Sequence, residues 1–295
     1  MCYSVAYLEK KAQKLAERYK DFFPADWSEE HVKGGVPLFS SMPPASPTGS
    51  TPADAGPSSG QLGMDLFGDE IQDPYEKDPD QLSAPGDLPT FYFVSGFSHP
   101  YLPVIRHDGL HLCQWGLVPL WARDAAAADD IRAKTLNAKG ETVFEKPSFR
   151  GSILTKRCLL PVSGFFEWRE VSKVKYPYFI RLKEEGLFSL GCIYAVWTDR
   201  QTGEQRQTFS IITTAANPLM EKIHNLKRRM PLIIGRDDEV AWADPDLGAE
   251  GIRKLIRPYD DAGMHAYTVS RSLNNPRNQR DIPEALEEVV YTELE

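Results

Sequence analysis

The stretch RCLLPVSGFFEW, residues 157–168, decides the fold class, because it is a run of large apolar and aromatic side chains flanked by charged residues. Runs of this kind, bounded by Gly, Pro or charged turns, are typical of β-strands. The pattern recurs in FYFVSGF (91–97), YPYFIRL (176–182), LFSLGCIYAVW (187–197), QTFSIITTAA (207–216) and MHAYTVS (264–270). The sequence therefore predicts an α+β fold that is β-rich, with a mostly antiparallel, barrel-like core and flanking helices.

Helices are predicted at three places. Over residues 5–23, apolar side chains recur at spacings of three and four, which is typical of an amphipathic helix. Only four residues would precede this helix, so position 2 is expected to lie close to the fold. Asn217 and Pro218 are typical of a helix N-cap and first turn, and another helix is predicted around residues 248–259. The apolar positions of the first helix are Leu8, Ala12, Leu15, Tyr19 and Phe22.

The charge of the chain is unevenly distributed. The chain has 295 residues, 41% of them hydrophobic and 26% charged, which is ordinary for a globular protein with a sizeable core. The net charge is −8, but residues 41–90 carry −8 and residues 281–295 carry −6, so the other 230 residues carry +6. A mildly basic body with two acidic segments keeps nucleic acid among the expected partners.

The domain organisation follows from composition. Residues 41–60 are rich in Pro, Ser, Gly and Ala and have almost no large apolar side chains, a composition typical of disorder. We interpret residues 41–88 as a disordered, acidic insertion in one domain spanning residues 1–280, because residues 1–40 are too short to form a core alone. Residues 281–295 are predicted to be an acidic tail.

The cellular setting is predicted from what the sequence lacks. No apolar run reaches the length of a membrane helix, and the first residues lack the pattern of a secretory signal. The four cysteines are far apart, with no CxxC pair, which fits a reducing compartment. We therefore expect a cytoplasmic, monomeric protein that does not bind membranes.

Cys2 is the first candidate for chemistry. Aminopeptidases remove Met1 when the next side chain is small, and the chain would then begin with an amine and a thiol on adjacent carbons. Such a 1,2-aminothiol condenses with an aldehyde to an imine and closes to a thiazolidine. It could equally serve as the nucleophile of an N-terminal hydrolase, and the alternative without function is a cysteine placed there by chance.

Two further side chains are candidates for proton transfer. Glu167 lies between Phe166 and Trp168 at the end of an apolar strand, where a carboxylate tends to have a raised pKa. His224 precedes the cations at residues 227–229, which favour its neutral form. The alternatives are a solvated glutamate at a strand end and a surface histidine in a basic turn.

Five separated motifs together resemble the SRAP family (SOS response-associated peptidase), the abasic-site-processing proteins. They are Cys2 after the initiator Met, WGLVPLW (115–121), LNAKGET (136–142), GFFEW (164–168) and IHNLKRRMP (223–231). The resemblance covers residues 1–40 and 90–280. It implies a barrel-like fold and a cysteine that becomes covalently joined to the aldehyde of an abasic site in single-stranded DNA.

The resemblance also implies roles for single residues. Asn137 would orient the Cys2 amine, Glu167 would act as general acid and base, and His224 would pass protons to the sugar oxygen. This chain departs from the family where Lys139 stands for the usual Arg, since lysine lacks the bidentate fork. Four residues separate His224 from Arg229, more than in the shortest family versions, so which arginine meets phosphate stays open.

Nucleic-acid contacts are predicted from the same segments. Lys139, Arg150, Arg228 and Arg229 are candidates for phosphate oxygens, with Arg271, Arg277 and Arg280 as weaker ones. Trp121 is predicted to stack on a base, whereas core packing is the better interpretation of Trp115. His107 and His111 form an isolated pair, so no metal is assigned, and no cofactor is predicted.

A short peptide in the insertion suggests a protein partner. QLGMDLF (61–67) resembles the peptide with which bacterial replication proteins dock on the sliding clamp, and a tethered, disordered segment is accessible for such docking. The alternative is a small amphipathic patch that folds back on the body. The clamp-binding side chains would be Gln61, Leu62, Met64, Leu66 and Phe67.

The sequence thus predicts a sensor of abasic sites that forms a thiazolidine crosslink through Cys2 and shields the lesion. An imine can also promote β-elimination, so a lyase side activity is expected. The alternative enzyme is a cysteine-type peptidase that acts on its own N-terminus or on peptides. A third alternative is a DNA-binding module without catalysis, whose binding would survive loss of Cys2, Asn137 and Glu167.

Overall fold

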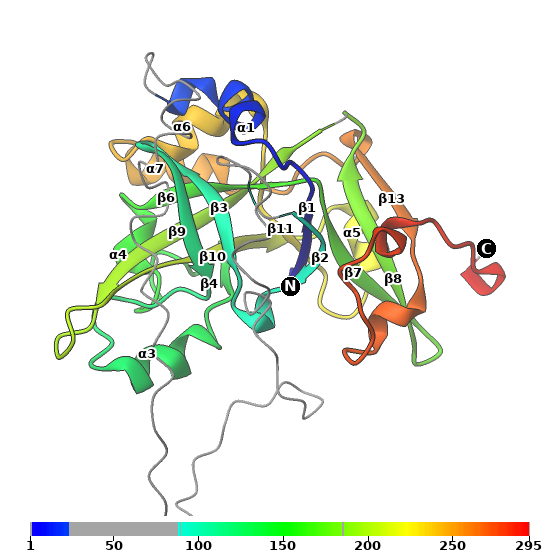
Figure 1. Ribbon diagram of the computed structural model, residues 1–295. Helices are drawn as coiled ribbons and strands as arrows, with labels where there is room; N and C mark the ends of the chain where they lie inside the picture. The colour runs from blue at the N-terminus through cyan, green and yellow to red at the C-terminus, as the bar shows by residue number, and fades with distance from the viewer. Residues whose placement is uncertain (1, 24–87, 89, 185, 295) are drawn as a thin grey trace, which may run out of the picture.

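The computed structural model describes residues 2–23, 88, 90–184 and 186–294, and its strands outnumber its helices (Figure 1). The peptide at residues 61–67 and most of the segment 41–88 lie outside this part. Within the described ranges, no helix is long and apolar enough to cross a membrane. The strands are β1 (Ser4–Tyr7), β2 (Phe91–Ser95), β3 (Tyr101–Arg106), β4 (Gly109–Trp115), β5 (Asn137–Lys139), β6 (Arg157–Val162), β7 (Gly164–Val171), β8 (Val174–Leu182), β9 (Phe188–Thr198), β10 (Gln205–Ala215), β11 (Arg229–Pro231), β12 (Ile233–Ile234) and β13 (Met264–Thr268). The helices are α1 (Ala12–Arg18), α3 (Ala125–Arg132), α4 (Arg150–Ile153), α5 (Pro218–Ile223), α6 (Glu239–Ala243) and α7 (Ala249–Leu255).

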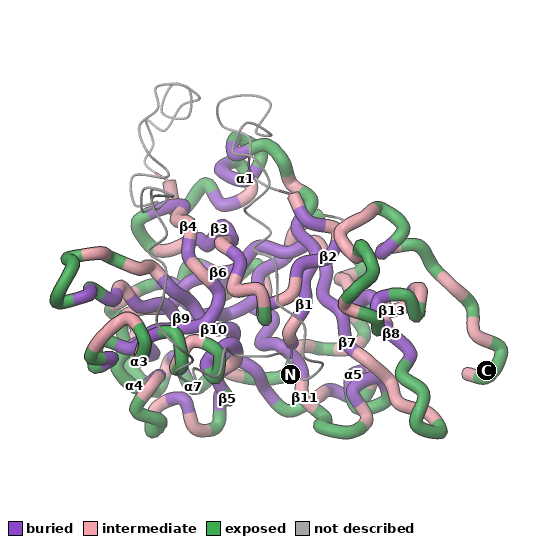
Figure 2. The backbone as a smooth tube through the Cα atoms, turned by 60° about the horizontal axis from the view of Figure 1, so that its bottom comes forward, coloured by how far each residue is buried: buried purple, intermediate pink, exposed green. Residues whose placement is uncertain are grey.

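A closed five-stranded barrel forms the centre of the molecule. Its strands follow the order β10, β4, β3, β6 and β9, and β9 pairs with β10 to close the ring. The β10–β4 pair is parallel and the other four pairs are antiparallel. Figure 2 shows these strands as buried segments in the middle of the fold. The predicted α+β class with a mostly antiparallel, barrel-like core is confirmed.

The stretch 157–168 does not form one strand. It turns at Ser163, so that β6 belongs to the barrel while β7 belongs to a second sheet with the order β13, β8, β7, β1 and β2. Gly164, the first residue of β7, lies closely against β8 of the same sheet: a Cβ at this position would lie 2.1 Å from Cζ of Phe179. One uninterrupted run of chain therefore connects the barrel to the second sheet.

The predicted helix over residues 5–23 is wrong in its first part. Residues 4–7 form strand β1, and the helix α1 begins only at Ala12. The side chains from Ser4 to Tyr7 are all buried, and β1 pairs with β7 on one edge and β2 on the other. Pairing with two distant strands has overridden the local helical spacing.

Long-range contacts hold the two ends of the chain to the fold. α1 is joined to α6 by Arg18 and Glu239, whose closest atoms lie 2.7 Å apart. The acidic segment 281–294 packs along the second sheet: Asp281 accepts a hydrogen bond from the backbone N–H of Tyr92, and Val289 donates one to Thr268 of β13. The helix that follows β1 is thereby attached to α6, and the C-terminal segment is attached to the second sheet.

Arg157, the first residue of the deciding stretch, is a buried cation that caps two helices. It is 1% exposed, and its guanidinium donates to the carbonyls of Ile153, the last residue of α4, and of Trp242 and Asp244 at the end of α6. Carbonyls at helix C-terminal ends carry partial negative charge, which compensates a buried cation.

We expect Arg157→Met to lower the free energy of unfolding by roughly 3 kcal/mol or more, because several buried carbonyls lose a charged donor. Urea unfolding followed by circular dichroism measures this difference. Arg123→Met, at an exposed position, is the control and should change stability little. A loss for Arg157→Met no larger than that of the control would contradict the capping role.

Candidate active site

Cys2 is fully buried and lies just before the first residue of β1. It is 0% exposed and belongs to the main core cluster together with Val5, Met220 and Ile223. Its thiol donates a long hydrogen bond to the carbonyl of Ser4, 3.8 Å away. Burial raises the pKa of the Cys2 thiol, and the nearby charge of Glu167 raises it further, so this cysteine is held as a neutral thiol.

Glu167 supplies a carboxyl group with a raised pKa near this thiol. It is the fourth residue of β7, it is 3% exposed, and its neighbour Phe166 pairs with Ser4 of β1. Burial raises its pKa to about 7, although the positive charges of the amino terminus and Lys227 pull in the other direction. The predicted desolvated carboxyl agrees with this arrangement, but the predicted strand end is wrong, because Glu167 lies in the middle of β7; the group is poised between its two forms near neutral pH.

His224 lies next to Glu167 and is neutral. It caps the C-terminus of α5, and its Nδ1 lies 3.8 Å from Oε2 of Glu167. The same Nδ1 donates to the carbonyl of Arg229, 2.8 Å away, so Nε2 carries the lone pair of the neutral ring. Burial lowers the pKa of His224 to about 4, and the charges of the amino terminus, Lys227 and Arg229 lower it as well.

These three residues form a compact arrangement for proton transfer. Cys2 lies just before β1, Glu167 lies on β7 and His224 follows α5, and the start of β1 lies near β7 and α5 in both views (Figures 1 and 2). At pH 7 the carboxyl can give or take a proton while the imidazole accepts one. The arrangement therefore suits addition and elimination at a carbonyl carbon.

Asn137 belongs to a short strand beside the barrel. It begins β5, which runs parallel to the end of β10, and it pairs with Ile211. Both polar atoms of its side-chain amide are buried without a hydrogen-bond partner among the described residues. The preceding residue, Leu136, shares the core cluster of Cys2. An unpaired buried amide of this kind is costly unless a ligand or reacting group completes it.

The predicted phosphate-binding side chains lie in different environments. Lys139, Arg150 and Arg228 are exposed, and Arg228 has a left-handed backbone with φ 50°. Arg229 instead forms a two-armed ion pair with Glu141 and donates to the carbonyl of Thr213, 2.6 Å away. Of these four cations, Arg229 is therefore the one already held by a carboxylate.

The two tryptophans of WGLVPLW have different surroundings. Trp121 is 53% exposed, and its indole N–H donates to the carbonyl of Pro147. Trp115 is fully buried and donates to the carbonyl of Leu136, so the prediction of core packing for Trp115 is confirmed. The ring of Trp121 has an open face on which a base can stack.

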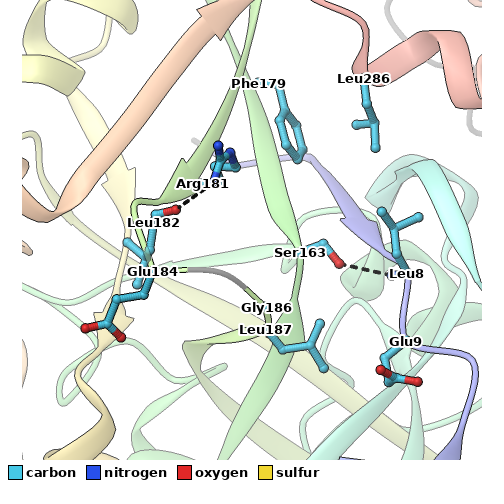
Figure 3. A pocket seen from close by; sticks show the side chains of 10 residues that line it. All are labelled: Leu8, Glu9, Ser163, Phe179, Arg181, Leu182, Glu184, Gly186, Leu187 and Leu286. Atoms are coloured by element: carbon cyan, nitrogen blue, oxygen red, sulfur yellow. Dashed lines mark hydrogen bonds between the residues drawn. The ribbon is translucent and has the colours of Figure 1, made fainter.

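The histidine pair belongs to a surface hairpin. His111 on β4 lies 3.0 Å from Asp108 in the turn, and Asp108 also binds Arg106. In the ranges that the structure describes, no three metal-ligating side chains are grouped. A cavity of about 360 Å³ lies at the far end of β1, lined in part by Leu8, Ser163 and Phe179, and it contains none of the predicted site residues (Figure 3).

Two further residues contribute to the site, and sequence reasoning found only the first of them, as one of the cations at residues 227–229. Lys227 is exposed, yet its charge lowers the pKa values of both Glu167 and His224. Asn225 binds the backbone of β7 at Glu170. The run of cations after His224 was a visible signal for Lys227, but nothing in the sequence relates Asn225 to a strand that lies 55 positions earlier.

The raised pKa of Glu167 predicts a pH-dependent stability difference. Its pKa is about 7 in the fold and 4.5 in the unfolded chain, so the native state binds the extra proton between these values and loses stability as the pH rises through them. Glu167→Gln removes this loss, and its stability relative to the wild type should increase by up to about 3 kcal/mol between pH 4.5 and 7. Urea unfolding at several pH values measures it.

Glu170→Gln on the same strand is the matched control for that experiment, because its side chain is partly exposed. His224 acts with the opposite sign, since its lowered pKa makes the wild type more stable as the pH rises from about 4 to 6.5. This contribution is present in both proteins and cancels in the comparison. A difference between Glu167→Gln and wild type that does not change with pH would show that the carboxyl has no raised pKa.

Comparison with known proteins identifies the family. The model of the SOS response associated peptidase (SRAP) family matches residues 89–276. The chain belongs to the SRAP family. The match begins close to β2 and ends after β13, so it covers the barrel and most of the second sheet.

Curated and solved relatives are similar to this chain over most of their own length. Abasic site processing protein YoqW of Bacillus subtilis is 40% identical over 213 residues, covering 70% of this chain and 90% of that protein. Abasic site processing protein YoaM of the same organism is 38% identical over 215 residues, covering 71% and 90%. An X-ray structure of a protein from Bacteroides thetaiotaomicron is 31% identical, covers 98% of this chain and 100% of that one, and superposes with a TM-score of 0.71.

Proposed function

We propose that this SRAP protein processes abasic sites in single-stranded DNA by forming a covalent thiazolidine crosslink through Cys2 and thereby shielding the lesion. The observation that carries the proposal is the buried thiol of Cys2 beside a carboxyl with a pKa of about 7 and a neutral imidazole. The names of the relatives, abasic site processing proteins, support the choice of substrate. We place the protein in the bacterial cytoplasm, at the nucleoid during repair, as a monomer.

The proposed chemistry begins with hydrolysis of the peptide bond between Met1 and Cys2. The free amine of Cys2 attacks the aldehyde carbon of the open-chain sugar, a C–N bond forms, and loss of water gives an imine. The thiol then adds to the imine carbon: a C–S bond forms, the π pair moves to nitrogen, and the thiol proton ends on that nitrogen.

Each candidate residue has a role in these steps. Glu167 gives a proton to the departing hydroxyl and takes one from the attacking amine, as its pKa near 7 allows. His224 passes a proton to the sugar oxygen through Nε2, since Nδ1 is bound to the carbonyl of Arg229. Asn137 orients the amine with its unpaired amide. The thiol of Cys2 reacts in its neutral form, which suits addition to an imine rather than early attack on the aldehyde.

The test is a denaturing gel of purified protein mixed with a single strand carrying one abasic site. Intact mass first verifies that Met1 has been removed. We expect a band that survives heat and detergent and whose mass equals protein plus DNA minus one water. Protein with a verified N-terminal Cys2 that gives no such band would refute the crosslinking function.

A cysteine-type peptidase is the alternative enzyme, acting on its own N-terminus or on peptides. Self-cleavage of Met1 remains part of the proposal: it predicts that protein made without methionine aminopeptidase still loses Met1, and that Glu167→Gln retains it. The same imine can also undergo β-elimination, so a slow lyase activity is expected beside the crosslink.

DNA contacts of this SRAP protein are proposed for the exposed side chains Trp121, Lys139, Arg150 and Arg228. Arg229 joins them only when Glu141 releases it, since the two are bound in the free protein. Phosphate contacts position the strand without reading its sequence, so binding should fall with rising salt.

We expect Arg228→Ala to weaken binding of a single strand and to reduce the slope of log affinity against log salt by about 0.7, the value for one lost phosphate contact. Arg229→Ala should change the slope less, because Glu141 neutralises this arginine. Fluorescence anisotropy at several salt concentrations measures both. Arg200→Ala is the control, since Arg200 is exposed in the turn before β10, at the end of that strand away from β11. Equal slopes for Arg228→Ala and the control would contradict the contact.

We propose, on sequence grounds alone, that residues 61–67 recruit the protein to the replication sliding clamp. The peptide QLGMDLF combines a glutamine with alternating apolar residues and a closing phenylalanine. A segment that folds into a groove on binding needs only a few anchors. A synthetic peptide of residues 57–70 should bind purified clamp in the micromolar range, and the same peptide with Leu66→Ala and Phe67→Ala should not. Absence of binding by the unchanged peptide would end this proposal.

A further inference from the structure

Asn225 makes a strand-like contact with β7. Its Nδ2 donates to the carbonyl of Glu170, 2.7 Å away, and its Oδ1 accepts from the N–H of the same residue, 3.1 Å away. An amide side chain therefore satisfies both backbone groups of one residue, as a neighbouring strand would. At a strand edge without such a partner, the backbone N–H and C=O groups form hydrogen bonds with water instead.

The contact lies on a defined edge of β7. Strand β8 covers one edge along the whole strand and pairs Glu170 with Lys175. Asn225 must therefore lie on the opposite edge, which β1 uses when it pairs with Gly164, Phe165 and Phe166. Glu167 stands between the part of this edge held by β1 and the part held by Asn225.

The residue before Asn225 is His224, and the loop that contains both is closed tightly. The N–H of Arg228 donates to the carbonyl of His224, 2.8 Å away, and the N–H of Ala216 donates to the carbonyl of Arg228. The imidazole of His224 is oriented by the carbonyl of Arg229. These bonds fix the loop internally, but they do not connect it to the strand that carries Glu167.

We infer that Asn225 is the positioning residue that holds His224 opposite Glu167, by fixing the loop after α5 to the free edge of β7. The catalytic role of the Glu167–His224 pair rests on the proposed function, but the geometry of the pair is a property of the protein without DNA. The 3.8 Å between Nδ1 of His224 and Oε2 of Glu167 joins two elements that are 57 positions apart in the sequence. Asn225, one residue from His224, bonds β7 three residues beyond Glu167.

The amide chemistry makes the role specific to asparagine. Aspartate at this position keeps an acceptor for the N–H of Glu170 but has no donor for its carbonyl, and two oxygens then face each other. Alanine removes both bonds. Both substitutions leave Glu167, His224 and Cys2 unchanged.

The chain offers a matched control on the other side of the same hairpin. Asn274 donates to the carbonyl of Lys175 and accepts from the indole N–H of Trp168, 2.8 and 2.7 Å away. Lys175 is the partner of Glu170 across β7 and β8. Asn274→Ala thus also removes two hydrogen bonds from this hairpin, one of them next to Glu167 at Trp168, but Asn274 lies outside the loop that carries His224.

The test compares Asn225→Ala, Asn225→Asp and Asn274→Ala in the full-length protein. The first readout is the rate of crosslinking to an abasic single strand from pH 5 to 9. We expect roughly a tenfold to hundredfold lower rate for both Asn225 variants, with an altered pH profile and affinity for the strand within about twofold of wild type. Asn274→Ala should retain the wild-type rate and profile. Asn225 variants that match Asn274→Ala in both would overturn the inference.

A second readout does not depend on crosslinking. The imidazole of His224 is followed by NMR in DNA-free protein as the pH changes. The groups facing it are Glu167 on β7, the charges of Lys227 and Arg229 and the amino terminus. A loosened loop exposes the ring, so its pKa should rise from about 4 towards 6.5 in Asn225→Ala and stay low in Asn274→Ala. An unchanged titration in Asn225→Ala would overturn the positioning role even in a protein that forms no crosslink.

Discussion

Cys2→Ala should reduce the heat-stable adduct with an abasic single strand to background while leaving an imine that borohydride can trap. The variant still begins with an amine once Met1 is removed, so the first addition and the loss of water remain available. It has no thiol to close the ring, and the imine hydrolyses during heating. The measurement is a pair of denaturing gels, one of which follows reduction with borohydride.

A matched control comes from the core itself. Cys113 is also fully buried and belongs to the same core cluster as Cys2, so Cys113→Ala tests for a loss of thiol volume without loss of the N-terminal thiol. We expect this control to crosslink like the wild type. A heat-stable adduct formed by Cys2→Ala at the wild-type rate would exclude the thiazolidine, and the covalent chemistry would then need another nucleophile.

Glu167→Gln from which an aminopeptidase has removed Met1, as intact mass verifies, should slow crosslinking by about 10²-fold or more at pH 7, the size of effect that general acid–base catalysis usually contributes. Glutamine keeps the shape and a hydrogen-bonding side chain but cannot exchange a proton. The wild-type rate should change with pH near 7, where Glu167 titrates, and this feature should be absent from the variant. Rates are measured by quenching the reaction at intervals and quantifying the adduct.

Two further variants show whether a slower rate of Glu167→Gln comes from the loss of its titratable group. Glu167→Asp retains a titratable group on a shorter stem and should recover part of the rate. Glu170→Gln, three residues along β7, should leave it unchanged, because that side chain is partly exposed and its backbone alone contacts Asn225. A Glu167→Gln rate within about threefold of wild type would remove Glu167 from the chemistry and leave His224 as the principal proton carrier.

Local patterns predicted those elements whose stability depends on their own composition. The aromatic and β-branched runs at residues 176–182, 187–197 and 207–216 correspond to β8, β9 and β10, and the Asn217 cap with Pro218 begins α5, with the side chain of Asn217 accepting from Met220. The run 157–168 was predicted as a strand, but its division depends on long-range pairing, of β6 with β3 and β9 in the barrel and of β7 with β1 and β8 in the second sheet.

Elements that exist because of distant pairing were not predictable in this way. Residues 4–7 have helical spacing with the sequence that follows, and they become a strand because β2 and β7 offer two edges. The site shows the same limit. Glu167 and His224 were identified individually, but their 3.8 Å separation, the pairing of Arg229 with Glu141 and the attachment of Asn225 to β7 all depend on long-range geometry.

The position of β1 between β2 and β7 has a mechanical consequence for a crosslinked protein. A DNA strand joined to Cys2 would pull on β1 along its length, two residues before its first paired position. Antiparallel bonds on both edges would then be loaded together in shear rather than opened one after another. A helicase or polymerase arriving at the lesion would meet an attachment that resists force, and removing the protein would require reversing the covalent bond or cutting the protein chain.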